Sequence, residues 1–188
     1  MTITDLYLVR HGLADGDGDL SPLGREQADR AGRRLSTVTF DAIHHSALPR
    51  AAATAEVIAG HVRAPRHACD HMMDRTPYPS DRASYPERWH AWLDGVPAGE
   101  RDPDAVRLRA AVAHLGVVGD TDRRELLITH NFVIGWFVRH VMDAPEWRWM
   151  SLYQENCAVT VLRWSSDRPP AMISFNQESE ESRPFTAS

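Results

Sequence analysis

The stretch Leu6-Tyr7-Leu8-Val9-Arg10-His11-Gly12 decides the fold expected for this sequence. Its first four residues are apolar and predict a buried strand, which runs directly into a cation, an imidazole and a glycine. Open α/β sheets bind their ligands outside the carboxyl ends of their strands. Gly12 lets backbone N–H groups approach an anion, Arg10 offers a fork of donors that suits phosphate, and His11 can act as a nucleophile at neutral pH. On these three residues alone, the end of this strand either performs phosphate chemistry or simply carries solvated charges, and the rest of the sequence must decide between the two.

Composition limits the kind of protein and its partners. A chain of 188 residues with a hydrophobic fraction of 43% is typical of a single globular domain. The formal net charge of −5 argues against a nucleic-acid partner. No apolar run approaches the roughly 20 residues that span a membrane, and the chain opens directly into its first strand without a signal peptide. With two cysteines that we expect to be reduced thiols, the sequence predicts a cytoplasmic protein with no membrane partner.

Strand patterns alternate with helix patterns along residues 1–177, which we expect to form one domain. The predicted strands lie at about 5–9, 42–45, 67–69, 125–129, 158–162 and 172–175, and the predicted helices at 22–35, 49–59, 103–115 and 132–142. This alternation predicts an α/β three-layer sandwich, with a mostly parallel central sheet and helices on both faces. The proline-rich segment 72–99 is expected to be a small lid insertion with a short helix at 87–93. The acidic tail 178–188 is expected to be disordered.

Three polar motifs each follow a predicted strand. They are Arg10-His11-Gly12, Ser46-Ala47-Leu48-Pro49-Arg50 and Thr129-His130-Asn131. Because the carboxyl ends of neighbouring parallel strands share one edge, two histidines and two arginines are expected to converge there. Each arginine can bind a phosphoryl group through paired hydrogen bonds, and the following helix N-termini add N–H donors. These motifs predict an anion site in a protein whose overall charge is negative.

With these motifs the chain resembles the histidine phosphatase superfamily, the phosphoglycerate-mutase-like fold. The matching stretches span most of residues 3–176 and comprise Leu8–Gly12, Leu20–Ala28, Ser46–Ala55, Ile128–Asn131 and Asn156–Thr160. The resemblance implies a metal-independent phosphomonoester hydrolase without a cofactor. His11 would attack phosphorus and become phosphohistidine, and water would then release phosphate. Arg10, Arg50 and His130 would bind the phosphoryl group, and the two arginines should keep His11 neutral by lowering its pKa.

The resemblance also places an acidic proton donor after the third strand, near the lid. The available residues there are Asp74, Asp70 and Asp81, in that order of preference. Asp74 is preferred because Asp74-Arg75-Thr76-Pro77 resembles the acid-x-x-Pro segment of the phosphoprotein-phosphatase members, which usually carry glutamate. Asn131 stands where the family usually has glycine, so either its backbone adopts the same turn or its amide contacts phosphate.

Two other functions are compatible with the motifs. The first is a phosphoglycerate-mutase-type phosphotransferase, but the family's mutases are longer and carry further polar matches where this chain has Leu13-Ala14-Asp15-Gly16. The second is a catalytically weak phosphoryl-binding module, against which the intact histidine and arginine pairs argue. For the phosphatase, the expected partner is a phosphorylated small molecule or a phosphopeptide. The sequence does not indicate an oligomeric state.

Some side chains have a structural interpretation beside a functional one. The sequence places His67, Cys69, Asp70 and His71 together, but a strand would point Asp70 away from the other three, which disfavours zinc. His44 and His45 either join the pocket or are structural residues at a strand end. The lid aromatics either face the substrate or pack a short helix; they are Tyr78, Tyr85, Trp89 and Trp92. A core or interface role is expected for Trp136, Phe137, Trp147 and Trp149.

Overall fold

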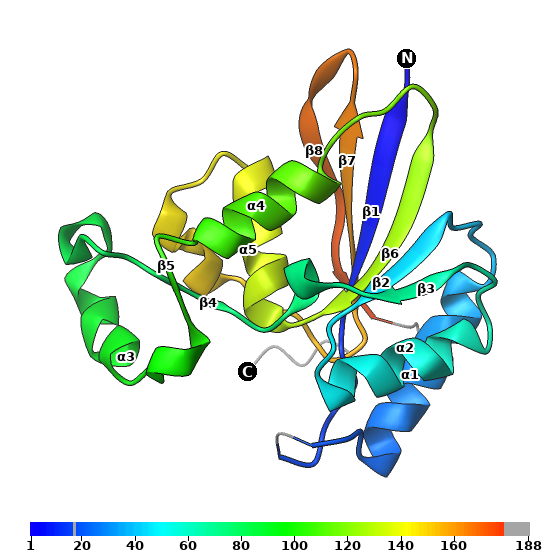
Figure 1. The fold of residues 1–188 in the computed structure, drawn as a ribbon, viewed down its shortest axis with the longest axis horizontal. Coiled ribbons are helices and arrows are strands. Elements are labelled where there is room, and N and C mark those ends of the chain that lie inside the picture. The colour runs from blue at the N-terminus through cyan, green and yellow to red at the C-terminus, as the bar shows by residue number, and fades with distance from the viewer. Residues whose placement is uncertain (17, 179–188) are drawn as a thin grey trace, which may run out of the picture.

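A central six-stranded sheet organises the computed structural model, which describes residues 1–16 and 18–178 (Figure 1). The strand order is β3-β2-β6-β1-β7-β8. Four strands run parallel, namely β1 (Ile3–Arg10), β2 (Ala42–His45), β3 (Arg66–Ala68) and β6 (Arg123–Thr129). The other two are antiparallel to their neighbours, namely β7 (Val159–Ser165) and β8 (Arg168–Gln177). The predicted disorder of the tail falls on residues that, apart from Glu178, lie outside the described range.

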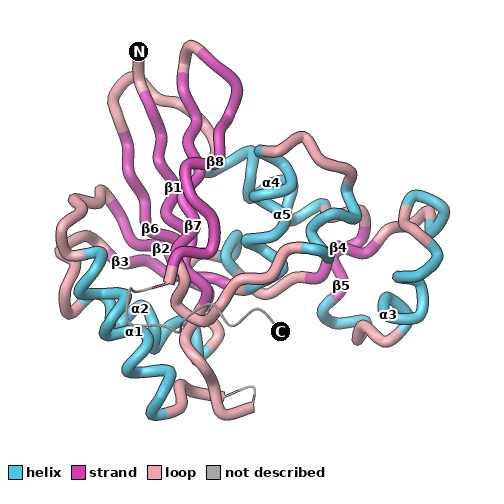
Figure 2. Tube along the Cα trace, turned by 180° about the vertical axis from the view of Figure 1, so that it is seen from behind, coloured by secondary structure: helices cyan, strands magenta, loops and turns pink. Residues whose placement is uncertain are grey.

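Two pairs of helices lie on opposite sides of this sheet (Figure 2). One pair is α1 (Pro22–Leu35) and α2 (Pro49–Ala59), and the other is α4 (Val106–Leu115) and α5 (Asn131–Val141). Alternate residues of β1 supply the two interfaces: Leu6 and Leu8 join the cluster beneath α4 and α5, and Val9 joins the cluster beneath α1 and α2. This alternation follows from the two-residue period of a strand. The predicted α/β sandwich is therefore confirmed.

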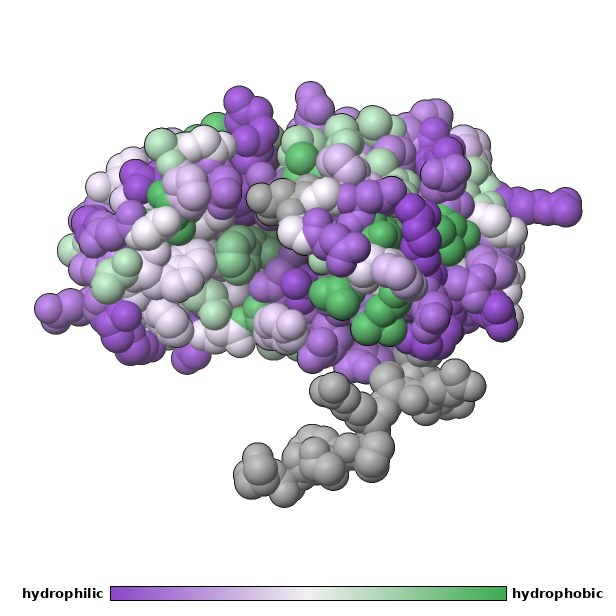
Figure 3. Space-filling model, turned by 90° about the horizontal axis from the view of Figure 1, so that it is seen from below, coloured by the Kyte–Doolittle hydropathy of each residue, from purple (hydrophilic) through white to green (hydrophobic). Residues whose placement is uncertain are grey.

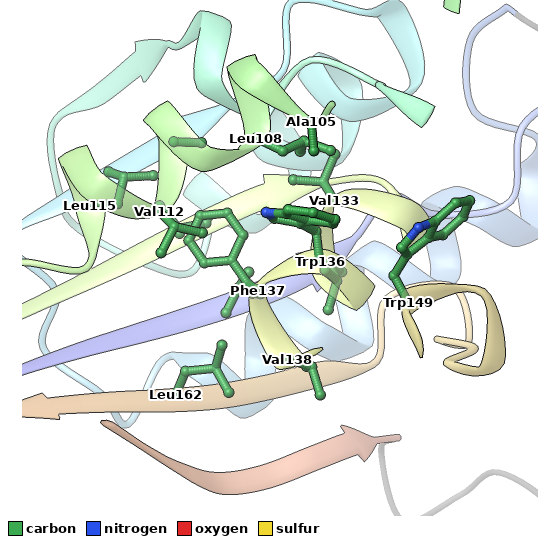
Figure 4. Packing of buried hydrophobic residues seen from close by; sticks show 14 of the residues in the cluster. Ala105, Leu108, Val112, Leu115, Val133, Trp136, Phe137, Val138, Trp149 and Leu162 are labelled. Carbon is green, nitrogen blue, oxygen red and sulfur yellow. The ribbon is translucent and has the colours of Figure 1, made fainter. Parts of the chain in front are cut away.

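Two of the largest buried side chains of the core lie between α5 and α4 (Figure 4). Trp136 and Phe137 of α5 are at most 1% exposed and pack among leucine and valine side chains of α4 and β7. Burying each ring stabilises the fold by about 1.5–3 kcal/mol. This packing holds α5, and with it the residues just before α5, rigidly against the sheet.

Residues 70–105 contain a small sheet that the sequence did not predict, and we call them the lid segment because they include the lid insertion predicted at 72–99. Strands β4 (Thr76–Tyr78) and β5 (Arg101–Pro103) pair in parallel, and α3 (His90–Asp94) lies between them. The strand pattern was hidden because each strand contains a proline, a residue usually found outside regular strands. Short 3₁₀ turns complete the chain at Asp70–Met72, Arg82–Ser84, Glu87–Trp89, Ala98–Glu100 and Glu146–Ser151. None of the helices in the described part of the chain is long and apolar enough to cross a bilayer.

The helix predicted from residue 103 begins at Val106 instead. Asp104 and Ala105 have φ angles of 50° and 52°, in the left-handed region, so they cannot belong to a right-handed helix. The buried carboxylate of Asp102 accepts hydrogen bonds from the backbone N–H groups of Arg107 and Leu108, at 3.1 and 2.9 Å. These bonds satisfy two of the helix's first donors and join the lid segment to α4.

Candidate active site

The three polar motifs meet at one edge of the sheet. β6 lies between β1 and β2, and Ile128 of β6 is in register with Val9 on one side and His45 on the other. The residues that follow these strands are therefore neighbours in space. Figure 3 views this end of the molecule, where hydrophilic and hydrophobic side chains are interspersed. The convergence expected from the sequence is what the structure shows.

Close backbone packing holds the loop that carries His11. A Cβ atom on Gly12 would lie 2.5 Å from the carbonyl oxygen of Gly24, so any larger residue would push α1 away. The Gly12 N–H donates to the hydroxyl oxygen of Thr54 at 3.0 Å, and this hydroxyl donates to the Arg50 carbonyl at 2.7 Å. Asn156 donates its side-chain N–H to the His11 carbonyl at 2.8 Å. The loop is thereby tied to both α2 and the segment before β7.

Hydrogen bonding determines which nitrogen of His11 carries the proton. Nδ1 lies 2.8 Å from the carbonyl oxygen of Gly12, and because a carbonyl only accepts, Nδ1 must donate. Nε2 of the neutral ring then holds the lone pair, and Arg50 donates its Nε–H to this atom at 3.2 Å. The lone pair therefore faces the guanidinium group that the sequence assigns to phosphate binding.

Burial keeps both histidines of the site neutral. It lowers the pKa of His11 to about 4, and the Arg50 and Arg10 charges act in the same direction. The sequence motifs predicted that the pKa of His11 is lowered, with the two arginines as the cause. In the structure, burial is the larger cause. His130 is 1% exposed, and burial together with His11 and the two arginines lowers its pKa to about 2.

Asp74 is the carboxylate that reaches the cluster. Its Oδ2 accepts a hydrogen bond from Nη2 of Arg50 at 2.9 Å and lies 3.4 Å from Nδ1 of His130. Burial raises the pKa of Asp74, although Arg50 pulls it in the opposite direction. Asp70 and Asp81 are exposed, and Asp81 instead accepts a hydrogen bond from the Ala83 N–H at 2.9 Å. The structure thus brings Asp74 into the site and leaves the two alternatives outside it.

His130 faces the same space as His11. The two ring centroids lie 5.1 Å apart. Neither nitrogen of the His130 ring has a hydrogen-bond partner among the described residues, although both are buried. Buried polar atoms are nearly always hydrogen-bonded in folded proteins. Both nitrogens are therefore available to a ligand of this pocket.

Arg10 is positioned by Gln154, a residue that no sequence motif marks, and through it by Asn131. Its Nη1 donates to the carbonyl of the fully buried Gln154 at 2.5 Å. The N–H of Gln154 donates to Oδ1 of Asn131 at 2.8 Å, and Asn131 is the first residue of α5. Asn131 therefore helps to place Arg10 through Gln154, and its contact with phosphate stays a prediction. Gln154 stands in a polar stretch between predicted elements, where no sequence pattern marks it.

The remaining histidine candidates lie outside this cluster. Nε2 of His44 is 3.6 Å from a carboxylate oxygen of Glu125, and Nδ1 of His45 is 2.9 Å from the Ser46 carbonyl oxygen. Both therefore have structural partners. Over residues 1–16 and 18–178, no group of three or more His, Cys, Asp or Glu side chains is arranged to hold a metal ion. The set at His67, Cys69, Asp70 and His71 does not assemble into such a site.

Comparison with known proteins identifies the family. The family model of the histidine phosphatase superfamily (branch 1) matches residues 6–177. The chain belongs to this superfamily. The match contains the loop after β1, the start of α2 and the start of α5, so it covers every residue of the cluster described above.

Named relatives within the superfamily include a phosphatase of animals. The mitochondrial serine/threonine-protein phosphatase PGAM5 of Xenopus tropicalis is 30% identical over 170 residues, which are 84% of this chain and 58% of that protein. The human protein of the same name is 29% identical and is covered over 56% of its length. The chain thus spans somewhat more than half the length of these curated relatives.

Solved structures share the fold of this chain. The mycobacterial glucosyl-3-phosphoglycerate phosphatase is 24% identical with a TM-score of 0.71, over 94% of this chain and 100% of that one. The phosphoglycerate mutase of Plasmodium falciparum is 22% identical with a TM-score of 0.66, over 100% and 98% of the two chains. The phosphoglycerate-mutase-like architecture expected from the motifs is therefore confirmed.

Proposed function

We propose that this member of the superfamily hydrolyses phosphomonoesters through a phosphohistidine on His11. The observation that carries the proposal is the orientation of His11. Its Nδ1 is held by the Gly12 carbonyl, and its Nε2 lone pair faces Arg50. A neutral imidazole with its free nitrogen toward a phosphate-binding cation has the properties of an activated nucleophile. Of the functions considered, phosphatase activity also fits the names of the curated relatives.

The first step is transfer of the phosphoryl group to His11. Nε2 of His11 forms a bond to phosphorus while the bond from phosphorus to the ester oxygen breaks. Asp74, whose pKa is raised, gives its proton to the departing oxygen, so the product leaves as a neutral alcohol. Arg10, Arg50 and His130 donate hydrogen bonds to the transferring oxygens, where negative charge is spread in the transition state.

The second step restores the enzyme. A water molecule attacks the phosphohistidine, the carboxylate of Asp74 takes a proton from that water, and the bond from phosphorus to Nε2 breaks. Inorganic phosphate leaves, and His11 and Asp74 return to their starting protonation states. The positive charges that this scheme requires come from guanidinium groups, so we expect it to run without a metal ion or cofactor.

The substrate is proposed to be a phosphorylated small molecule or a phosphopeptide. PGAM5 is named a serine/threonine-protein phosphatase, and a structural neighbour of similar fold is named a phosphatase of glucosyl-3-phosphoglycerate. The net charge of −5 argues against nucleic acid as a partner. The cytoplasmic location stays a prediction, and the curated relatives are named as mitochondrial proteins.

Hydrolysis without metal tests the proposed function. The protein, stripped of metal and assayed in EDTA, is expected to release phosphate from p-nitrophenyl phosphate at the same rate as without EDTA. The reason is that Arg10 and Arg50 neutralise the phosphoryl oxygens. Activity that disappears with EDTA and returns with a divalent cation would contradict the mechanism, and absence of hydrolysis under both conditions would contradict the function.

Asp74→Asn tests the proton donor. The variant is expected to lower kcat for alkyl phosphates by about 10²–10⁴-fold, because an alkoxide needs a proton as it leaves. The effect on p-nitrophenyl phosphate should be much smaller, since p-nitrophenolate leaves without one. Asp81→Asn, in the same lid segment but exposed, serves as the control and should change neither rate. Equal losses on both substrates in Asp74→Asn would assign the proton to another group.

The pH dependence follows from the two shifted pKa values. His11 attacks only when neutral, so kcat/KM is expected to stay high until pH falls toward about 4, where His11 becomes protonated. An alkyl phosphate needs a proton from Asp74, so its kcat/KM should fall as pH rises through the raised pKa of Asp74, and Asp74→Asn should lack this falling limb. The measurement is kcat/KM against pH, corrected for ionisation of the substrate. An acid limb centred near the ordinary histidine pKa would contradict the assignment to a buried His11.

A further inference from the structure

An aromatic pocket lies beside the proposed phosphate site. It has a volume of about 290 Å³, and its walls include Trp92, Phe132, Trp149 and Tyr153. Asn131, the residue after His130, also contributes to this pocket. Tyr153 adjoins the other side of the site, because its ring centroid is 5.3 Å from the Arg10 guanidinium carbon. We use the name aromatic pocket for this hollow.

Three rings from different parts of the chain form one cluster in its wall. Phe132 of α5 meets Trp149 at 5.0 Å and Trp92 of α3 at 5.7 Å, and the two tryptophans are 5.9 Å apart. All three contacts are edge-on, an arrangement that aromatic pairs favour. The Trp149 N–H donates to the Tyr85 hydroxyl at 2.9 Å, and Trp149 is 1% exposed. The buried, hydrogen-bonded Trp149 thus fixes the cluster in place, and the cluster joins the lid segment to α5.

The outer side chains of the pocket are exposed to solvent. Trp92 is 42% exposed and Tyr153 is 57% exposed. Large aromatic groups that face water on the rim of a pocket are typical of ligand-binding surfaces, because a flat apolar ligand removes their surface from water. The buried Trp136, by contrast, is only 1% exposed.

We propose that the aromatic pocket binds the leaving group, and that the preferred substrates are phosphomonoesters whose alcohol carries an aromatic ring. The inference rests on the proposed function of the phosphate site, to which Asn131 and Tyr153 connect the pocket. A cavity of about 150 Å³ can hold a benzene ring, so a pocket of 290 Å³ has room for one ring and its link to the phosphate. A small polar alcohol would leave most of these rings uncovered.

Binding of two phosphonates tests this inference independently of turnover. Phosphonates resist hydrolysis, so calorimetry with 2-phenylethylphosphonate and ethylphosphonate reports only on the pocket and the phosphate site. The wild-type protein is expected to bind the phenyl compound about 10-fold more tightly or better, from burial of the ring. Trp92→Ala should remove most of this preference and leave the Kd of ethylphosphonate unchanged. Trp147→Ala, a half-buried tryptophan outside the pocket, is the matched control and should keep the preference.

A second variant covers the case in which Trp92→Ala disturbs the lid segment. Ser151 is exposed and lines the pocket, so Ser151→Phe is expected to fill the pocket and weaken the phenyl compound alone. Equal affinity of wild-type protein for the two phosphonates would overturn the inference. So would a preference that survives both pocket variants. If the preference is found but no phosphomonoester is hydrolysed, the aromatic pocket stands and the proposed reaction is what fails.

Discussion

His11→Ala is expected to lower kcat for p-nitrophenyl phosphate by about 10³-fold or more, the loss that follows removal of a nucleophile. No other described imidazole can take over from the same position. His130, whose ring centroid is 5.1 Å away, follows a different strand and has no carbonyl partner that would direct one of its nitrogens. The rate should be measured at saturating substrate, together with the Tm, so that loss of chemistry is separated from loss of fold.

The control for this variant is a histidine that lies in the sheet itself. His67 of β3 is exposed, and its removal is expected to leave kcat within about twofold, as surface substitutions usually do. If His11→Ala were folded and retained near-wild-type turnover, the nucleophile would have to be a different group. Loss of activity in both variants would indicate a general sensitivity of the sheet rather than a role in the reaction.

Arg50→Lys is expected to lower kcat/KM by about 10²–10³-fold, the cost of removing one oriented donor from a charged transition state. The wild-type guanidinium donates from Nε to His11 and from Nη2 to Asp74. A lysine keeps the positive charge, but its single ammonium cannot reproduce this fork or bind a phosphoryl group with two parallel hydrogen bonds. A loss of kcat/KM in Arg50→Lys would therefore report on the arrangement of the hydrogen-bond donors of Arg50 rather than on its positive charge.

Arg25→Lys is the matched control for Arg50→Lys. Arg25 also pairs with a carboxylate, that of Asp19 at 2.8 Å, but its side chain is 51% exposed. Its replacement should leave kcat/KM unchanged. If Arg50→Lys behaved like Arg25→Lys, overall positive charge would suffice, and the oriented contacts of Arg50 with His11 and Asp74 would have no catalytic consequence.

The strand ends could be predicted from the sequence because the relevant signals are local. Arg10, His11, Arg50 and His130 each stand directly after an apolar run or at the start of a helix pattern. A parallel sheet then brings such positions to one edge, whatever the details of packing. Most of the site could therefore be predicted from where each of these residues stands relative to its own strand or helix.

The parts that escaped prediction depend on contacts between distant segments. Gln154 holds Arg10 through its backbone carbonyl. Every residue has such a carbonyl, so the residue type at position 154 does not reveal this contact. The pairing of β4 with β5 was hidden by Pro77 and Pro103. Likewise, the low pKa of His11 has burial as its largest cause, and burial is a property of the folded chain rather than of the residues flanking His11.

Direct detection of the phosphoenzyme tests the central claim most closely. The protein would be mixed rapidly with p-nitrophenyl phosphate and quenched in alkali, because phosphohistidine is labile in acid, and its peptides would be examined by mass spectrometry. We predict a phosphoryl group on His11, formed within one turnover, present in Arg25→Lys and absent from His11→Ala. A phosphoryl group on a different residue, or turnover with no phosphorylated peptide in a quench fast enough to precede product release, would contradict the account.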